Sequence, residues 1–143
     1  MDRSAPRPLN AERPDGTMYI ISVRAHYDAA HFLRNYTGKC ANLHGHRYEV
    51  EAAMAFEELG PGGMAIDFVD AKAALRSIAD ELDHQNLNEL EPFRELESSA
   101  ENQARYIYDE LKRRLGDVGP NLLYVRIWES PNQWAQYSER LIV

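Results

Sequence analysis

Residues 44–58 read HGHRYEVEAAMAFEE, and apolar and polar side chains alternate along this stretch. Successive side chains of a strand point to opposite faces, so the alternation predicts a half-buried strand. One face carries both histidines and the apolar residues, and the other face is charged. The first set is His44, His46, Tyr48, Val50, Ala52, Met54 and Phe56, and the second includes Arg47, Glu49, Glu51 and Glu57.

A second alternating run precedes this strand at residues 18–30 and leads directly to His31. If the two strands pair antiparallel, His31 meets His44 and His46 close to the connecting loop. Three neutral imidazoles leave a coordination position open, as a catalytic zinc site requires, although copper, iron and nickel also accept imidazole. We therefore expect these three histidines to bind a metal ion, with zinc favoured. His26 has the opposite parity, and we expect it to be structural.

Cys40 is the only cysteine and lies four residues before His44. A single cysteine cannot form an intrachain disulfide. Lys39 and a nearby cation would favour its thiolate form, which could act as a nucleophile or a general base. The thiolate could instead be a fourth metal ligand, which would make the site structural, or the side chain could simply fill the core. The residues alone leave these alternatives open.

The composition indicates one globular domain in a chain of 143 residues. The net charge of −7 argues against a nucleic-acid-binding protein, which needs a basic face. No apolar run is long enough for a membrane span or a signal peptide, and an unpaired cysteine suits a reducing cytoplasm, so we expect a cytoplasmic protein. Residues 1–17 are rich in proline and arginine and are expected to form a flexible arm before a domain at 18–143.

The rest of the chain predicts two helices and two further strands. Asp67 is expected to cap a helix that ends near Asp83. The pattern Ser98-x-x-Glu101 resembles a capping box at the start of a second helix, which Gly116 would end. Strands are expected at 122–129 and 136–142, separated by a turn at 131–132. The order β-β-α-α-β-β predicts an α+β domain, with a four-stranded antiparallel sheet and both helices on one face.

Two further groups of residues could carry chemistry. Asp83-His84 can be an acid/base pair in which the carboxylate orients the imidazole, or Asp83 can cap the helix end while His84 faces solvent. Glu129 lies on an apolar strand and could bind a guanidine-like heterocycle edge through two hydrogen bonds, or it could be an exposed residue at a strand end.

Together these motifs resemble the 6-pyruvoyl-tetrahydropterin synthase family, most closely its bacterial branch of 6-carboxy-5,6,7,8-tetrahydropterin synthases. The gap in C-x-x-x-H-G-H is typical of that branch. The sequence departs from the family at three places. Ser98-Ser99 stands where the family usually has a threonine, Gln85 where it has a histidine, and Ser130 where it has a threonine. The matching stretches, in family order, are YDAAH (27–31), GKCANLHGH (38–46), IDF (66–68), LDHQNLN (82–88), SSAENQA (98–104) and WES (128–130).

The resemblance implies the tunnelling fold, in which three subunits join their sheets into a barrel and two trimers stack into a homohexamer. It implies one zinc ion per subunit, bound by His31, His44 and His46. Active sites would lie between subunits. It also implies that Cys40 is the proton acceptor and that Asp83 and His84 form an acid/base pair. Glu129 would anchor the pterin, and Glu101 and Ser99 would lie near it.

The implied reaction is a zinc-dependent lyase reaction on 7,8-dihydroneopterin triphosphate. It yields 6-carboxy-5,6,7,8-tetrahydropterin, acetaldehyde and triphosphate, for queuosine biosynthesis. Lys39, Arg24 and Arg47 are candidates to bind the triphosphate. The alternatives are a pyruvoyl-forming or folate-route enzyme on the same pterin, and a non-catalytic binding module stabilised by zinc.

Overall fold

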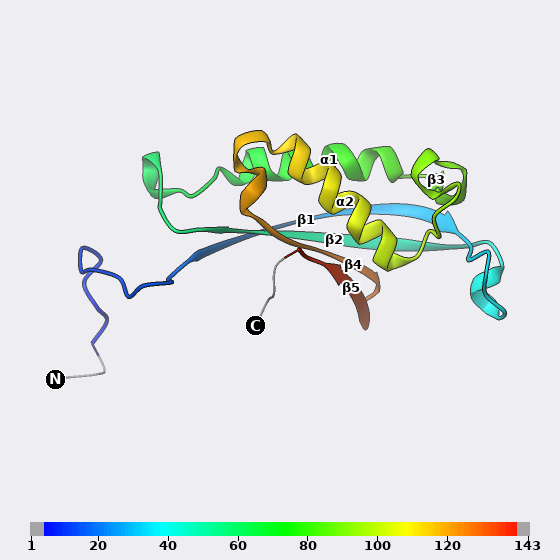
Figure 1. Cartoon of the computed structure of the whole chain (residues 1–143), viewed down its shortest axis with the longest axis horizontal. Helices are drawn as coiled ribbons and strands as arrows, with labels where there is room; N and C mark the ends of the chain where they lie inside the picture. The colour runs from blue at the N-terminus through cyan, green and yellow to red at the C-terminus, as the bar shows by residue number, and fades with distance from the viewer. Residues whose placement is uncertain (1–4, 140–143) are drawn as a thin grey trace.

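Two long strands form the centre of the fold (Figure 1). The computed structural model describes residues 5–139. β1 (Tyr19–His31) and β2 (His44–Phe56) pair antiparallel along their full length, with His31 opposite His44 and Tyr19 opposite Phe56. The residues from Tyr48 onward that share parity with His44 pack in the core, as predicted, but Glu51, Ala53 and Ala55 of the other parity are also buried, so this end of β2 is covered on both faces.

The sheet has five strands in the order β3-β1-β2-β4-β5, not the four that we expected. β4 (Leu122–Ser130) pairs antiparallel with β2, whereas β3 (Gln85–Asn86) adds two residues parallel to β1. A strand of two residues is too short to produce a sequence period. β5 (Gln133–Tyr137) begins earlier than the expected 136–142, because the two-residue turn places Gln133 opposite Ser130. Residues 140–142 of that expected strand lie outside the described residues.

Both helices lie on one face of the sheet, as predicted, with α1 (Phe68–Leu82) over β1 and α2 (Ala100–Arg114) over β4 (Figure 1). Asp67 caps α1 by accepting a hydrogen bond from the Val69 backbone nitrogen at 2.9 Å. None of the helices within residues 5–139 has the length and apolar character needed to cross a bilayer.

The predicted capping box at Ser98 and Glu101 is wrong. Ser99 is the N-cap of α2, and its hydroxyl accepts from the Asn102 backbone nitrogen. Ser98 is fully buried, and its hydroxyl donates to Asn88 instead. Gly116 follows the last turn of α2 with a φ of 61°, a left-handed conformation that suits glycine, so the predicted end of this helix is confirmed.

The core fills the space between the helices and the sheet. Leu75 of α1 is 0% exposed, and we expect Leu75→Ala to lower the free energy of unfolding by about 2–5 kcal/mol. Val69 lies in the first turn of the same helix and is 70% exposed, so Val69→Ala should cost less than about 0.5 kcal/mol. Urea unfolding followed by circular dichroism measures both values, and equal losses would contradict this packing.

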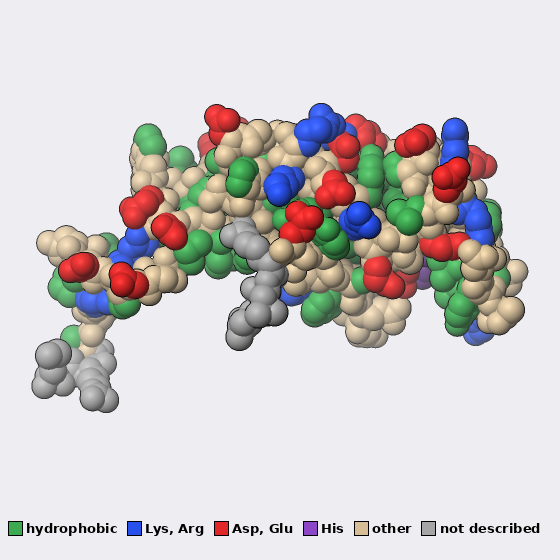
Figure 2. All heavy atoms as spheres, viewed as in Figure 1, with side chains coloured by type: hydrophobic (Ala, Val, Ile, Leu, Met, Phe, Trp, Pro, Cys, Tyr) green, Lys and Arg blue, Asp and Glu red, His purple; other side chains and the backbone are tan. Residues whose placement is uncertain are grey.

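The opposite face of the sheet is polar. Arg24 donates to Glu51 at 2.8 Å, Arg47 forms two hydrogen bonds with Asp28 at 2.9 and 3.0 Å, and Arg126 stacks over Trp134. Acidic and basic side chains are also interspersed over the helical layer in Figure 2. The face of the molecule that Figure 2 shows therefore lacks the continuous basic surface that nucleic-acid binding requires.

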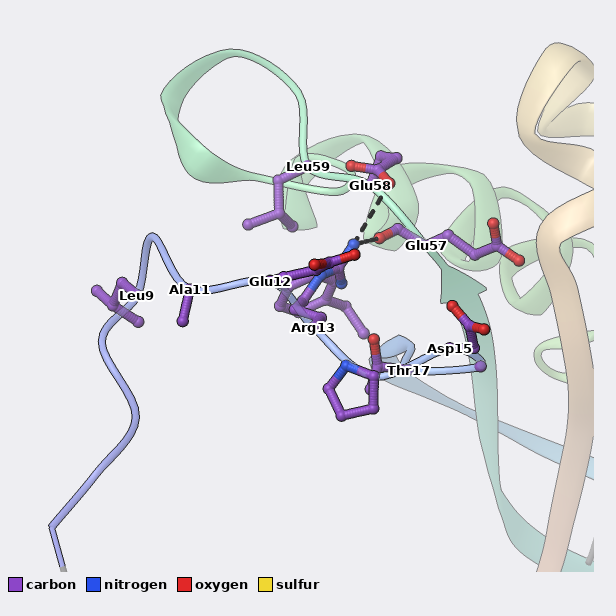
Figure 3. Close-up of a pocket in the computed structure, with 12 residues that line it drawn as sticks. Leu9, Ala11, Glu12, Arg13, Asp15, Thr17, Glu57, Glu58 and Leu59 are labelled. Atoms are coloured by element: carbon purple, nitrogen blue, oxygen red, sulfur yellow. Dashed lines mark hydrogen bonds and ion pairs between the residues drawn. The ribbon is translucent and has the colours of Figure 1, made fainter. Parts of the chain in front are cut away.

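The N-terminal arm contains no helix or strand between residues 5 and 18, but Arg13 contacts the domain (Figure 3). Its guanidinium donates to the Glu57 carbonyl, pairs with Glu58 at 3.4 Å and lies 5.0 Å from the centre of the Tyr19 ring. The arm is therefore attached where β1 begins and β2 ends.

Candidate metal centre and active site

Three histidines converge where β1 ends and β2 begins. The cross-strand register places His31 opposite His44 and Ala29 opposite His46. The centroid of the His31 ring lies 4.5 Å from that of His44 and 5.7 Å from that of His46. The centroids of the His44 and His46 rings are 5.0 Å apart. One nitrogen from each ring lies within 4.8 Å of the other two, so this cluster could hold a metal ion.

Backbone carbonyls determine which nitrogen faces the cluster. His31 Nδ1 lies 2.6 Å from the Ser98 carbonyl oxygen, and His44 Nδ1 lies 2.7 Å from that of Asn42. A carbonyl oxygen only accepts hydrogen bonds, so each Nδ1 carries the proton and each Nε2 keeps a free lone pair. Such a second partner is the usual way to orient a metal-binding imidazole.

His31 Nε2 is buried and has no hydrogen-bond partner among residues 5–139. An unsatisfied buried nitrogen is costly, and a cation would satisfy it. Burial lowers the pKa of His31, against the effect of its bond to Ser98, and the neighbouring His44 and His46 lower it further. Glu129 acts in the opposite direction, and the net lowering favours the neutral form that metal ligation needs.

Glu129 lies at the edge of this cluster. Its Oε1 is 3.9 Å from His31 Nε2, and its Oε2 accepts from the Gln133 side chain at 3.2 Å. The side chain is 24% exposed, so the alternative of a fully solvated strand end does not describe it. Glu129 lines two hollows, one of about 120 Å³ with Ala100 and Trp134 and one of about 610 Å³ with Arg24 and Arg47.

Cys40 lies on the 3-10 helix η1 (Lys39–Ala41) in the loop between β1 and β2. Its carbonyl accepts from the Leu33 backbone nitrogen at 2.7 Å, and its side chain is half-buried. Within residues 5–139, no cluster of potential ligand atoms joins Cys40 to the three histidines. The geometry therefore gives no support to sulfur as a fourth ligand.

Asp83 and His84 form a separate group with Asp28. His84 Nε2 is 3.5 Å from Asp83 Oδ2, while Asp83 Oδ1 accepts from the Asp28 backbone nitrogen at 2.8 Å. The Asp28 carbonyl accepts from the His84 backbone nitrogen, and His84 has a φ of 58°. The His84 side chain is 80% exposed, so the imidazole is available to a group outside this chain.

The other predicted binding residues are less closely associated with the cluster. Ser99 and Glu101 lie in the first turn of α2, where Ser99 is the cap and Glu101 is exposed, and Lys39 is exposed on η1. Arg24 and Arg47 lie on the polar face of the sheet, where each pairs with a carboxylate.

Three buried polar residues near the cluster had no predicted role there, namely Asn88, Ser98 and Gln103. All three fall within the family-like stretches 82–88 and 98–104. Periodicity could not distinguish them, because a buried polar residue breaks the apolar pattern without indicating its partner.

Comparison with known proteins agrees with this architecture. The family model of 6-pyruvoyl tetrahydropterin synthase matches residues 20–140. A 6-carboxy-5,6,7,8-tetrahydropterin synthase of Haemophilus influenzae is 32% identical over 85% of this chain and 100% of its own length. A 6-pyruvoyl tetrahydrobiopterin synthase of Drosophila melanogaster is 37% identical over 70% of this chain and 61% of its own length.

A solved structure supports the same assignment. The 6-pyruvoyl tetrahydropterin synthase of Caenorhabditis elegans superposes with a TM-score of 0.79 at 28% identity, over 87% of this chain and 97% of that one. The histidine cluster, the two-layer α+β fold and these matches agree, and the chain is an enzyme that belongs to the 6-pyruvoyl tetrahydropterin synthase family.

Proposed function

We propose that the chain is a zinc-dependent lyase that converts 7,8-dihydroneopterin triphosphate and water to 6-carboxy-5,6,7,8-tetrahydropterin, acetaldehyde and triphosphate, in queuosine biosynthesis. The observation that carries the proposal is the convergence of three imidazole nitrogens without sulfur. The relative from Haemophilus influenzae, which is matched over its whole length and named for the carboxy product, supports this branch of the family.

His31, His44 and His46 would hold the zinc ion, because three nitrogen ligands leave one position of a tetrahedral site open. A zinc ion bound in this way supplies a Lewis acid that polarises an oxygen of the substrate. The buried, unpartnered Nε2 of His31 fits this role, since it presents a lone pair where no donor from residues 5–139 reaches it.

Two acid/base groups would then move protons on the side chain of the substrate. The Cys40 thiolate would remove one proton, and His84, oriented by Asp83, would handle the opposing transfer. The His84 side chain projects into solvent. It lies close to Asp28 and Asp83 and not to the three clustered histidines. This placement supports the proposal that Asp83 and His84 serve the metal site of a neighbouring subunit.

Assembly into a homohexamer would complete the site. β1 pairs with β3 only at Ala29 and Ala30, so within residues 5–139 its outer edge from 19 to 28 has no partner strand, and β5 pairs only with β4. Open edges are sites for pairing with another chain.

Glu129 would anchor the pterin through its 2-amino and N3 edge, with Ser99 and Glu101 nearby. We expect Glu129→Gln to raise KM by about 10–100-fold, because the amide can accept only one of the two hydrogen bonds and lacks the charge. Steady-state kinetics with the pterin triphosphate measures this change. Glu95→Gln, on an exposed side chain outside the proposed site, is the matched control and should leave KM unchanged, so equal effects would remove the anchoring role from Glu129.

A pyruvoyl product is the second candidate, and the relative from Drosophila melanogaster supports it. The test is to incubate the zinc-loaded protein with 7,8-dihydroneopterin triphosphate and to identify the products by mass spectrometry. Acetaldehyde and the carboxypterin are the expected products. A pyruvoyl product that retains all side-chain carbons would contradict the carboxy reaction, and unreacted triphosphate would contradict both.

A further inference from the structure

The ring of His31 is held by a carbonyl that accepts two hydrogen bonds. The Ser98 carbonyl oxygen lies 2.6 Å from His31 Nδ1 and accepts from the Gln103 side-chain nitrogen at 2.9 Å. A carbonyl oxygen has two lone pairs, so these donors saturate it. Gln103 in turn accepts from the Tyr27 hydroxyl at 2.6 Å, which links the start of α2 to β1.

The backbone immediately after His31 is held by a second side chain. Asn88 Oδ1 accepts from the Phe32 backbone nitrogen at 2.9 Å, and Asn88 Nδ2 donates to the Phe32 carbonyl at 3.0 Å. The Ser98 hydroxyl donates to Asn88 Oδ1 at 2.9 Å. Asn88 thus binds Phe32 as a neighbouring strand would, at the point where β1 ends.

These residues are buried, with exposures of 6% for Asn88 and 0% for Ser98 and Gln103. A fully satisfied polar network in a core is rigid, because each lost bond would leave a buried group unpaired. His31 is therefore held at its ring through Ser98 and at its backbone through Asn88.

We propose that Asn88, Ser98 and Gln103 act as positioning residues that fix the tautomer and orientation of His31, and so set the zinc affinity of the enzyme. The inference rests on the metal site of the proposed function. Loss of the Gln103 donor would let the Ser98 carbonyl shift away from His31 Nδ1, which would weaken the hydrogen bond that keeps the proton on that nitrogen. In the other tautomer Nε2, the nitrogen that faces the cluster, carries the hydrogen and has no lone pair for the metal ion.

The decisive variant is Gln103→Met, which keeps the length of the side chain and removes both its donor to the Ser98 carbonyl and its acceptor for the Tyr27 hydroxyl. We expect its zinc dissociation constant, measured by competition with a chromophoric chelator, to rise about 10–100-fold. Nitrogen-15 NMR of the metal-free protein should show Nδ1-protonated His31 in the wild type and a mixture of tautomers in the variant. A purely structural role of Gln103 would not alter the tautomer.

Asn121→Ala is the control, because Asn121 donates to the Ala55 carbonyl at the opposite end of β2, so its loss removes a hydrogen bond far from the histidine cluster. Its zinc affinity and its His31 spectrum should match the wild type. If Gln103→Met does not fold, Ser98→Ala serves instead, since it removes only the hydroxyl that bonds Asn88 and Phe32 and should weaken zinc binding by several-fold.

The outcomes separate this inference from the proposed function. A wild-type protein that binds no zinc would contradict the proposed metal site, while the NMR measurement would still decide the role of the network. Unchanged zinc affinity together with an unchanged His31 tautomer in the variants would overturn the positioning role and leave the proposed function intact.

Discussion

His44→Ala is expected to release the metal ion and to reduce turnover by about 10³-fold. Two imidazoles remain in this variant, and the loss of a Lewis acid removes several kcal/mol of transition-state stabilisation, at about 1.4 kcal/mol per factor of ten. His44 is a better target than His31, because the His44 side chain is only half-buried. Its removal also leaves the bond between His31 and Ser98 and the bond between Phe32 and Asn88 in place. Elemental analysis of the purified protein measures the zinc content.

His26→Ala is the matched control for this experiment. His26 lies on the same strand as His31 but is exposed on the opposite face, so the variant should keep its zinc and its turnover. Full zinc content in His44→Ala would show that the histidines are not the ligands. Zinc loss with undiminished turnover would show that the metal is not part of the chemistry.

Cys40→Ala is expected to keep its zinc and to reduce kcat by about 10²–10⁴-fold, the usual contribution of a positioned acid/base group. Zinc should remain because the thiol lies outside the cluster of three imidazole nitrogens. The two measurements are the zinc content and kcat of the same preparation. Loss of zinc would identify sulfur as a ligand, and unchanged kcat would remove Cys40 from the mechanism.

Cys40→Ser separates the chemistry of the thiol from its packing. The hydroxyl has nearly the size of the thiol but is a far weaker acid, so it cannot supply a thiolate-like base at neutral pH. We expect the serine variant to be as slow as the alanine variant. A serine variant with near-normal turnover would show that volume, and not proton transfer, makes Cys40 necessary.

The central hairpin can be predicted from the sequence because the alternation of apolar and polar side chains is a local property of each strand. Alternation along residues 44–58 assigns His44, His46 and Tyr48 to one face without any knowledge of the partner strand. The run ending at His31 has the same property, and pairing of the two strands brings the histidines together. Helix ends at Asp67 and Gly116 are likewise local, since each depends on one side chain or one backbone conformation.

The features that the sequence did not predict depend on distant partners. The Ser98 carbonyl that orients His31 is 67 residues away along the chain, and a backbone atom leaves no mark on residue type. Ser98 and Glu101 match a capping box by spacing, yet burial turns Ser98 toward Asn88 and leaves the cap to Ser99. β3 has two residues, and its existence depends on Ala29 and Ala30 of the neighbouring strand.

The pairing of His31 with His44 also bears on how the chain finds its correct alignment during folding. A slip of one residue would expose the apolar face, but a slip of two residues preserves the alternation, so burial of apolar side chains discriminates weakly against it. A slip that places His31 opposite Asn42 would move His46 to about 13 Å from His31 along the strand axis, so the three imidazoles could no longer share one ion. A bound cation would therefore favour the native alignment over this slipped one, which burial of apolar side chains discriminates against only weakly.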